Sequence, residues 1–104
     1  MRAKPDITAA DCVKTATPGF LPFCGTSASA PHAAAIAALM LSGKPGLTIA
    51  EARQAFKNTA LDIEAPGWDR DSGYGILMAD KVLDALAPFV RLNPGTLELL
   101  LLKK

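Results

Sequence analysis

Residues 24–32 read CGTSASAPH and lead directly into an apolar, alanine-rich segment that ends at Leu41. Gly25, Thr26 and Ser27 predict a tight turn that brings a serine to the first turn of a buried helix. A helix start offers unpaired backbone N–H groups and the positive end of the helix dipole. A nucleophile and a developing oxyanion can therefore be stabilised there together. By themselves the three residues are more typical of an ordinary N-cap on a core helix, so the catalytic interpretation needs support from the rest of the chain.

The chain has 104 residues and a formal net charge of +1; half of its residues are hydrophobic and a fifth are charged. This is the composition of a globular protein, long enough for one small domain or for part of a larger one. The near-neutral charge gives no indication of a nucleic-acid or anionic-membrane partner. The apolar segment is too short and too rich in alanine to cross a bilayer. We see no signal peptide, because the first six residues lack an apolar core.

Local patterns predict three helices and two short extended segments. Thr48 and Glu51 have the spacing of a capping box, in which each side chain satisfies a backbone N–H of the other residue. The glycines and the proline of Ser42–Gly46 end the first helix, and Pro88 ends the last one. The helices are expected at 26–42, 48–60 and 79–87, and the extended segments at 4–10 and 76–77.

Cys12 and Cys24 are the two cysteines of the chain and lie on either side of a loop rich in turn residues. Together with a single histidine they cannot complete a four-ligand zinc site. Two interpretations stay open, a disulfide and a pair of buried free thiols. A disulfide over this spacing would contribute on the order of 3 kcal/mol in the chain-entropy account and would imply an oxidising compartment.

Four segments, in this order and spacing, resemble the C-terminal part of the catalytic domain of subtilisin-like serine proteases, the subtilases. The most specific is the serine signature Gly-Thr-Ser-x-Ser-x-Pro-His, which an alanine-rich helix follows. The resemblance implies an α/β fold, the C-terminal portion of a subtilisin-like parallel-sheet domain with mainly helices and a few short strands. That domain would cover residues 1–90, and residues 91–104 would be the start of a following segment or a truncated tail. The four segments are Lys4–Ile7, Gly25–His32, Thr48–Ala60 and Gly73–Leu77.

The resemblance also implies roles for individual residues. Ser27 corresponds to the catalytic nucleophile, its backbone N–H would be one donor to the oxyanion, and Gly25 would keep the approach to the serine open. His32 belongs to the structural part of the signature. Geometry independently argues against His32 as the general base: five residues along a helix turn a side chain by about 140°, whereas partners on a helix lie three or four residues apart.

The sequence departs from the family pattern at two places. Ala10–Asp11 stands where a Pro-Gly pair is usual, which predicts an altered loop before the serine, and Met78 stands where asparagine is frequent. The sedolisins, a neighbouring family, share a very similar serine signature. The Pro31–His32 step and the segment Gly73–Gly75 favour the subtilisin-like family.

The chain has one histidine, and this count bears directly on activity. A serine protease triad needs an imidazole bonded to the serine and a carboxylate that orients it. In subtilisin-like proteins these residues precede the serine in the order Asp, His, Ser, so both are expected upstream of residue 1. We therefore expect a fragment of a secreted serine endopeptidase, inactive alone, whose intact form cleaves proteins or peptides and whose partner is the missing N-terminal part of the domain. The alternative is a non-catalytic remnant or a partner-dependent interaction module, which the apolar run Leu97–Leu102 and the exposed face of the alanine-rich helix motivate.

No cofactor or metal site is evident in the sequence, although calcium is possible for the intact family domain. Asp69 and Asp71 are the candidate calcium ligands of this chain. Two carboxylates fall short of the six to eight oxygens that calcium takes unless carbonyls and water complete the set. The other interpretation is a solvated acidic loop.

Overall fold

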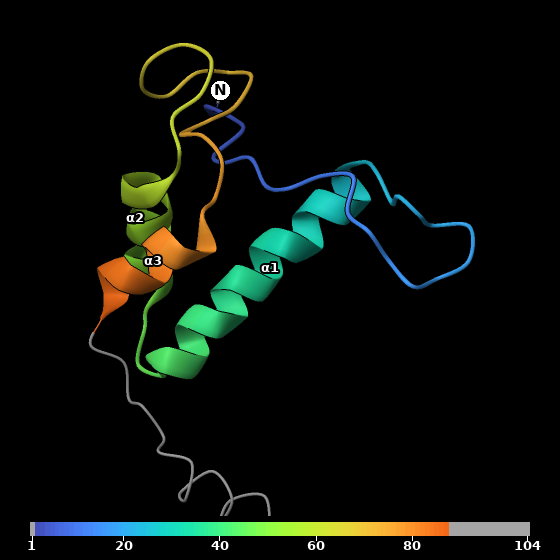
Figure 1. Ribbon diagram of the computed structural model, residues 1–104. Coiled ribbons are helices and arrows are strands. Elements are labelled where there is room, and N and C mark those ends of the chain that lie inside the picture. Colours follow the sequence, from blue (N-terminus) through green and yellow to red (C-terminus); the bar gives the residue numbers. More distant parts are fainter. Residues whose placement is uncertain (1, 88–104) are drawn as a thin grey trace, which may run out of the picture.

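The computed structural model describes residues 2–87, and the regular structure of these residues consists of three helices. Helix α1 (Thr26–Gly43) is the longest, and α3 (Ala79–Leu86) packs against both α1 and α2 (Ile49–Thr59) (Figure 1). Among residues 2–87, no helix combines the length and the hydrophobicity that a bilayer crossing requires. The expected boundary at residue 90 and the run Leu97–Leu102 lie outside the described residues.

The hydrophobic core lies where the three helices meet. Met40 of α1 and Val82 of α3 are fully buried, with 0% of each residue exposed. Leu77 enters the same cluster from the segment before α3, so the extended piece that the sequence predicted at 76–77 is anchored by its apolar side chain. The remaining buried members are Ile36, Leu47 and Ala55.

The start of α2 confirms the predicted capping box. The Thr48 hydroxyl accepts a hydrogen bond from the backbone N–H of Glu51 at 3.2 Å, and the Glu51 carboxylate accepts from the backbone N–H of Thr48 at 2.8 Å. These hydrogen bonds to the charged form hold the pKa of Glu51 below its usual range. The cap fixes where α2 begins and thereby places Ala55 in the core.

Helix α1 is less buried than its composition predicts. Only Ala28, Ile36 and Met40 are buried among its residues, while Leu39 is 52% exposed and Leu41 is 49% exposed. Among residues 2–87 the predicted buried helix is therefore buried along one face only. The physical reason is that residues 2–87 cover one face of α1, and alanine on every side of a helix does not distinguish that face from the others.

A small crossing of three segments stands where the sequence predicted short strands. Ile76 pairs in parallel with Thr8 and antiparallel with Leu61. The backbone N–H of Ile76 donates to the Leu61 carbonyl at 2.9 Å, and the Thr8 N–H donates to the carbonyl of Gly75 at the same distance. Within residues 2–87 each pairing is a single bridge, which corrects the expected short strands. Parallel pairs gain stability mainly inside larger covered sheets. The single parallel bridge is compatible with the expected α/β class, which stays a prediction.

Two glycines make this crossing possible. A Cβ on Gly73 would lie 2.3 Å from the Asp6 carbonyl oxygen, and a Cβ on Gly75 would lie 2.1 Å from the carbonyl oxygen of Leu61. Gly75 also has a φ of +113°, which a residue with a side chain rarely adopts. Glycine is therefore required at positions 73 and 75 by the close approach of three backbone segments.

Candidate active site

Ser27 is the second residue of α1 and is exposed to solvent. Helix α1 begins directly after Gly25, whose carbonyl accepts from the backbone N–H groups of Ala28 at 2.9 Å and Ser29 at 3.2 Å. The N–H groups of Thr26 and Ser27 precede these two donors and so belong to the open end of the helix. The exposed residue Ser27 thus brings a hydroxyl and a backbone N–H to the positive end of the helix dipole.

Pro31 lies inside α1, one turn after this start. It has no N–H to donate to the carbonyl of Ser27, four residues earlier. The first turn of α1 therefore relies on the bonds that the Gly25 carbonyl accepts, together with whatever fixes the residues before Gly25.

A hairpin closed by a disulfide leads into this helix start. Val13 and Phe23 form an antiparallel bridge, with each N–H donating to the other residue's carbonyl at 2.9 Å. Next to that bridge, Cys12 and Cys24 are joined by a disulfide, with their Cα atoms 4.0 Å apart. The loop of the hairpin projects beyond the N-terminal end of α1 (Figure 1). Because Cys24 directly precedes Gly25, the disulfide anchors the chain at the residue from which the turn begins.

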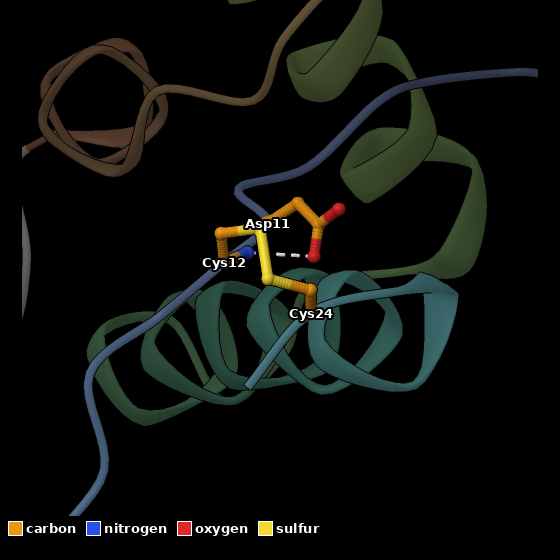
Figure 2. A group of neighbouring side chains, drawn as sticks. All are labelled: Asp11, Cys12 and Cys24. Carbon is orange, nitrogen blue, oxygen red and sulfur yellow. Dashed lines mark hydrogen bonds between the residues drawn. A yellow bond between two sulfur atoms is a disulfide. The ribbon is translucent and has the colours of Figure 1, made fainter. Parts of the chain in front are cut away.

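The Asp11 carboxylate adds a second link to the same place (Figure 2). Its Oδ1 accepts hydrogen bonds from the backbone N–H of Cys12 and from the backbone N–H of Gly25, both at 2.6 Å. Sequence reasoning noted Asp11 only as a departure from the family pattern and missed this contact. The signal that was present is an acidic residue next to a cysteine whose disulfide partner precedes the serine turn.

His32 does not face Ser27. Its Nδ1 lies 3.1 Å from the carbonyl oxygen of Ala28, one turn earlier in α1. A carbonyl oxygen only accepts, so Nδ1 carries the proton in this bond. The partly buried imidazole borders an apolar hollow of about 250 Å³ between the hairpin and α1, with Val13 and Phe23 on the other side. This arrangement matches the interpretation of His32 as a hydrogen-bonded packing residue.

The acidic loop with Asp69 and Asp71 is organised by hydrogen bonds. Asp69 Oδ1 accepts from the N–H groups of Asp71 and Ser72, both at 2.7 Å, and Oδ2 accepts from the Ser72 hydroxyl at 2.7 Å. The Ser72 hydroxyl, followed by its N–H, holds the pKa of Asp69 below its usual range. Both Asp69 oxygens thus serve the fold of the loop, and calcium binding by an intact domain stays a prediction.

One group of three potential metal ligands occurs among residues 2–87, formed by Asp11, Cys12 and Cys24. The two sulfur atoms are bonded to each other. Metal coordination by cysteine requires the thiolate, so this group is a structural link in the observed state.

Comparison with known proteins places these features in a context. The sequence model of the subtilase family matches residues 2–75. Fervidolysin from Fervidobacterium pennivorans is 38% identical over 64 residues, which are 62% of this chain and 9% of that protein. A probable subtilase-type serine protease of Deinococcus radiodurans is 35% identical over 71 residues, which are 65% of this chain and 10% of that protein.

The structural comparison points to the same relative. The crystal structure of fervidolysin, described as a keratinolytic enzyme related to subtilisin, superposes with a TM-score of 0.58 at 35% identity. The superposition covers 70% of this chain and 11% of the fervidolysin chain. This chain thus spans about a tenth of the length of the relatives that it matches.

Proposed function

The chain belongs to the subtilase family, and from that premise we propose that it contributes the nucleophile, Ser27, to a serine endopeptidase that hydrolyses peptide bonds. The observation that carries the proposal is the position of Ser27 at the exposed, open start of α1. There the hydroxyl oxygen attacks the scissile carbonyl carbon, and the backbone N–H of the same residue donates to the oxyanion that forms.

The general base and the carboxylate that orients it come from residues other than those described. His32 is the single histidine of the chain, and its Nδ1 is directed at the carbonyl of Ala28. Members of a catalytic triad act as a unit, so a serine without its base loses several orders of magnitude in rate. We therefore expect the 104-residue chain alone to be inactive toward peptides.

A chimera tests the role of Ser27. The segment of fervidolysin that matches this chain is replaced by residues 2–75, and hydrolysis of a chromogenic peptide is measured. We expect activity in the chimera and a loss of about 10⁴-fold or more on Ser27→Ala, because the nucleophile is removed. Ser29→Ala is the matched control, since Ser29 lies in the same helical turn, and it should retain activity. A Ser27→Ala chimera as active as its parent refutes the proposal.

The isolated chain tests the second half of the proposal. It is incubated with a fluorophosphonate probe and with the same chromogenic peptide. We expect neither turnover nor robust labelling of Ser27, because no base activates the hydroxyl. Robust labelling together with turnover would show that the chain carries a working base, and the assignment of His32 as a packing residue would then be wrong.

We further propose that the enzyme acts on protein or peptide substrates in an oxidising, extracellular compartment. The support is the exposed disulfide between Cys12 and Cys24, since disulfides persist outside the reducing cytosol. Alkylation of the protein isolated from its source measures this directly. Both cysteines should resist the reagent until a reductant is added, and free thiols in the untreated protein would contradict the proposal.

A second candidate function is a non-catalytic module that folds or acts on a partner. The observation in its favour is the exposure of large apolar side chains, with Leu39 at 52% on α1 and Leu21 at 68% in the hairpin. Sedimentation and thermal unfolding of the chain distinguish the two cases. A monodisperse monomer that unfolds cooperatively argues against dependence on a partner.

A further inference from the structure

We propose that Asp11 is a positioning residue for Ser27 and acts through the backbone of Gly25. The inference deepens the proposed function and takes its catalytic meaning from it. The contact itself, however, is a property of the chain that can be tested without any activity. Asp11 is neither a member of the serine signature nor a residue that the resemblance assigns to the site.

The Asp11 carboxylate links two segments that are distant in the sequence. Asp11 Oδ1 accepts two backbone hydrogen bonds at 2.6 Å, one from the adjacent Cys12 and one from Gly25, which is 14 residues away in the sequence. Hydrogen bonds to an ionised carboxylate are shorter and about twice as strong as bonds between neutral groups. One oxygen atom thus joins the segment that enters the hairpin to the residue that starts the serine turn.

Gly25 has an unusual backbone conformation. Its φ of 115° and ψ of 176° lie in a region that only glycine adopts readily. A Cβ built on Gly25 would meet nothing within 4 Å, so it is the backbone conformation, and not a lack of space, that favours glycine here. Its N–H is held by Asp11 and its carbonyl by the N–H groups of the first helical turn. Hydrogen bonds therefore hold both the N–H and the carbonyl of Gly25, and among residues 2–87 Asp11 supplies the hydrogen bond to its N–H.

The disulfide lies beside the contact between Asp11 and Gly25. Cys12 follows Asp11 and Cys24 precedes Gly25, so the disulfide and the carboxylate connect the same two short segments (Figure 2). The disulfide limits the distance between the segments but leaves the Gly25 peptide plane free to turn. The carboxylate sets that orientation, and its charge also favours the positive end of α1. The orientation of the Gly25 peptide in turn sets the direction of the Ser27 hydroxyl and N–H, two residues later.

Amide hydrogen exchange of the full 104-residue chain, followed by ¹⁵N NMR, tests the inference. In Asp11→Ala we expect the amides of Gly25 and Cys12 to exchange at least about tenfold faster, since each loses a bond to a charged acceptor. The amide resonance of Ser27 should shift as well, because its peptide is no longer held. Asp11→Asn keeps an acceptor oxygen in the same place and should restore much of the protection.

Asp62→Ala is the matched control. Asp62 is also exposed and its Oδ2 accepts a loop N–H at 2.7 Å, from Gly67, far from α1. This variant should unprotect Gly67 and leave Gly25 and Ser27 unchanged. A general loosening of the chain would appear in both variants, whereas a positioning role appears in Asp11→Ala alone and is rescued by asparagine.

Two results with Asp11→Ala overturn the inference. One is a Gly25 amide that exchanges at the same rate in Asp11→Ala and in the parent chain; the other is a Ser27 resonance that does not move when Gly25 loses protection. An unprotected Gly25 in the parent chain would overturn it too, because the contact would then not exist in solution. The failure of the proposed function is a separate outcome: the fervidolysin chimera would be indifferent to Ser27→Ala while Gly25 still depended on Asp11.

Discussion

Gly25 and Gly75 have almost the same φ, 115° and 113°, yet they sit in opposite surroundings. Gly75 is buried in the crossing of three segments, where a Cβ would lie 2.1 Å from the Leu61 carbonyl oxygen. Gly25 is exposed at the serine turn, where a Cβ would meet nothing within 4 Å. The same positive φ thus occurs in a closely packed crossing at one place and, at the other, in an open turn linked by a carboxylate and a disulfide.

The difference shows how this chain separates stability from accessibility. The crossing is held by backbone hydrogen bonds that leave no room for a side chain, and it carries Leu77 into the core. The serine turn is exposed to solvent, and Asp11 and the disulfide link it to the segment before the hairpin. The proposed nucleophile, Ser27, needs access to solvent. A small number of links can hold the turn in place without burying this residue.

The largest expected effect is that of Gly75→Ala. A side chain there combines backbone strain with overlap against the Leu61 carbonyl, and together these should lower the free energy of unfolding by about 4 kcal/mol. Urea unfolding followed by circular dichroism measures the change. Gly46→Ala is the control, since Gly46 has open space around it and should change stability little. A Gly75→Ala variant as stable as this control would break the comparison.

Reduction of the disulfide should have the next largest effect, and it should be local. The chain-entropy account gives about 3 kcal/mol for a closed loop of this length. The amides of Val13 and Phe23, which close the hairpin, should lose protection in reductant, while the amide of Ile76 in the crossing keeps it. A Cys12→Ser, Cys24→Ser double variant should behave like the reduced chain and ignore the reductant. Equal loss of protection at Ile76 would mean that the two regions are not independent.

Gly25→Ala is the sharpest counterpart to Gly75→Ala. The two positions share a strongly positive φ, but of the two only Gly75 lacks space for a Cβ. Gly25→Ala should therefore cost the strain alone, about 2 kcal/mol, measured by the same urea unfolding. If both variants lost equal stability, overlap at the crossing would contribute nothing and the contrast between the regions would fail.

Elements that depend on near neighbours in the sequence were predictable. The capping box joins Thr48 to Glu51, and the predicted start of α2 is confirmed because both partners lie within one turn. The end of α3 at Leu86 likewise follows from the proline at position 88. The position of Ser27 at a helix start was also predictable from the neighbouring residues Gly25 and Thr26. Its catalytic role stays a proposal.

Features that join distant segments were not predictable from patterns. The Gly73-Tyr74-Gly75 motif indicated an extended piece, but nothing local shows that Gly75 meets Leu61, because backbone pairing leaves no side-chain signature. Asp11 was interpreted as a missing Pro-Gly feature, since its partner Gly25 lies 14 residues away. That Leu39 lies on the exposed face of α1 was not predictable, because an alanine-rich helix carries no polar face to mark the side turned to solvent.

The smallest expected effect is a pH dependence at the crossing, through Asp69. The backbones of Asp69 and Gly73 exchange two hydrogen bonds, at 3.0 and 2.9 Å. The Ser72 hydroxyl holds the pKa of the Asp69 carboxyl below its usual range. A depressed pKa in the folded state means that the hydrogen bonds stabilise the fold above the unfolded pKa and are lost as the pH falls through the folded one. Asp69→Asn should therefore lower the urea midpoint at neutral pH, and its deficit against the parent chain should shrink on acidification below the usual carboxyl range.

Asp71→Asn separates this effect from the general titration of acidic residues. The Asp71 side chain is exposed and two positions away in the same loop, and its carboxylate accepts no hydrogen bond from residues 2–87, although its N–H donates to Asp69. Its urea midpoint should follow that of the parent chain at every pH. If Asp71→Asn reproduced the pH-dependent deficit of Asp69→Asn, the effect would come from loop charge rather than from the hydrogen bonds at Ser72. The crossing would then be held by backbone packing alone, and its contrast with the carboxylate-held serine turn would be sharper still.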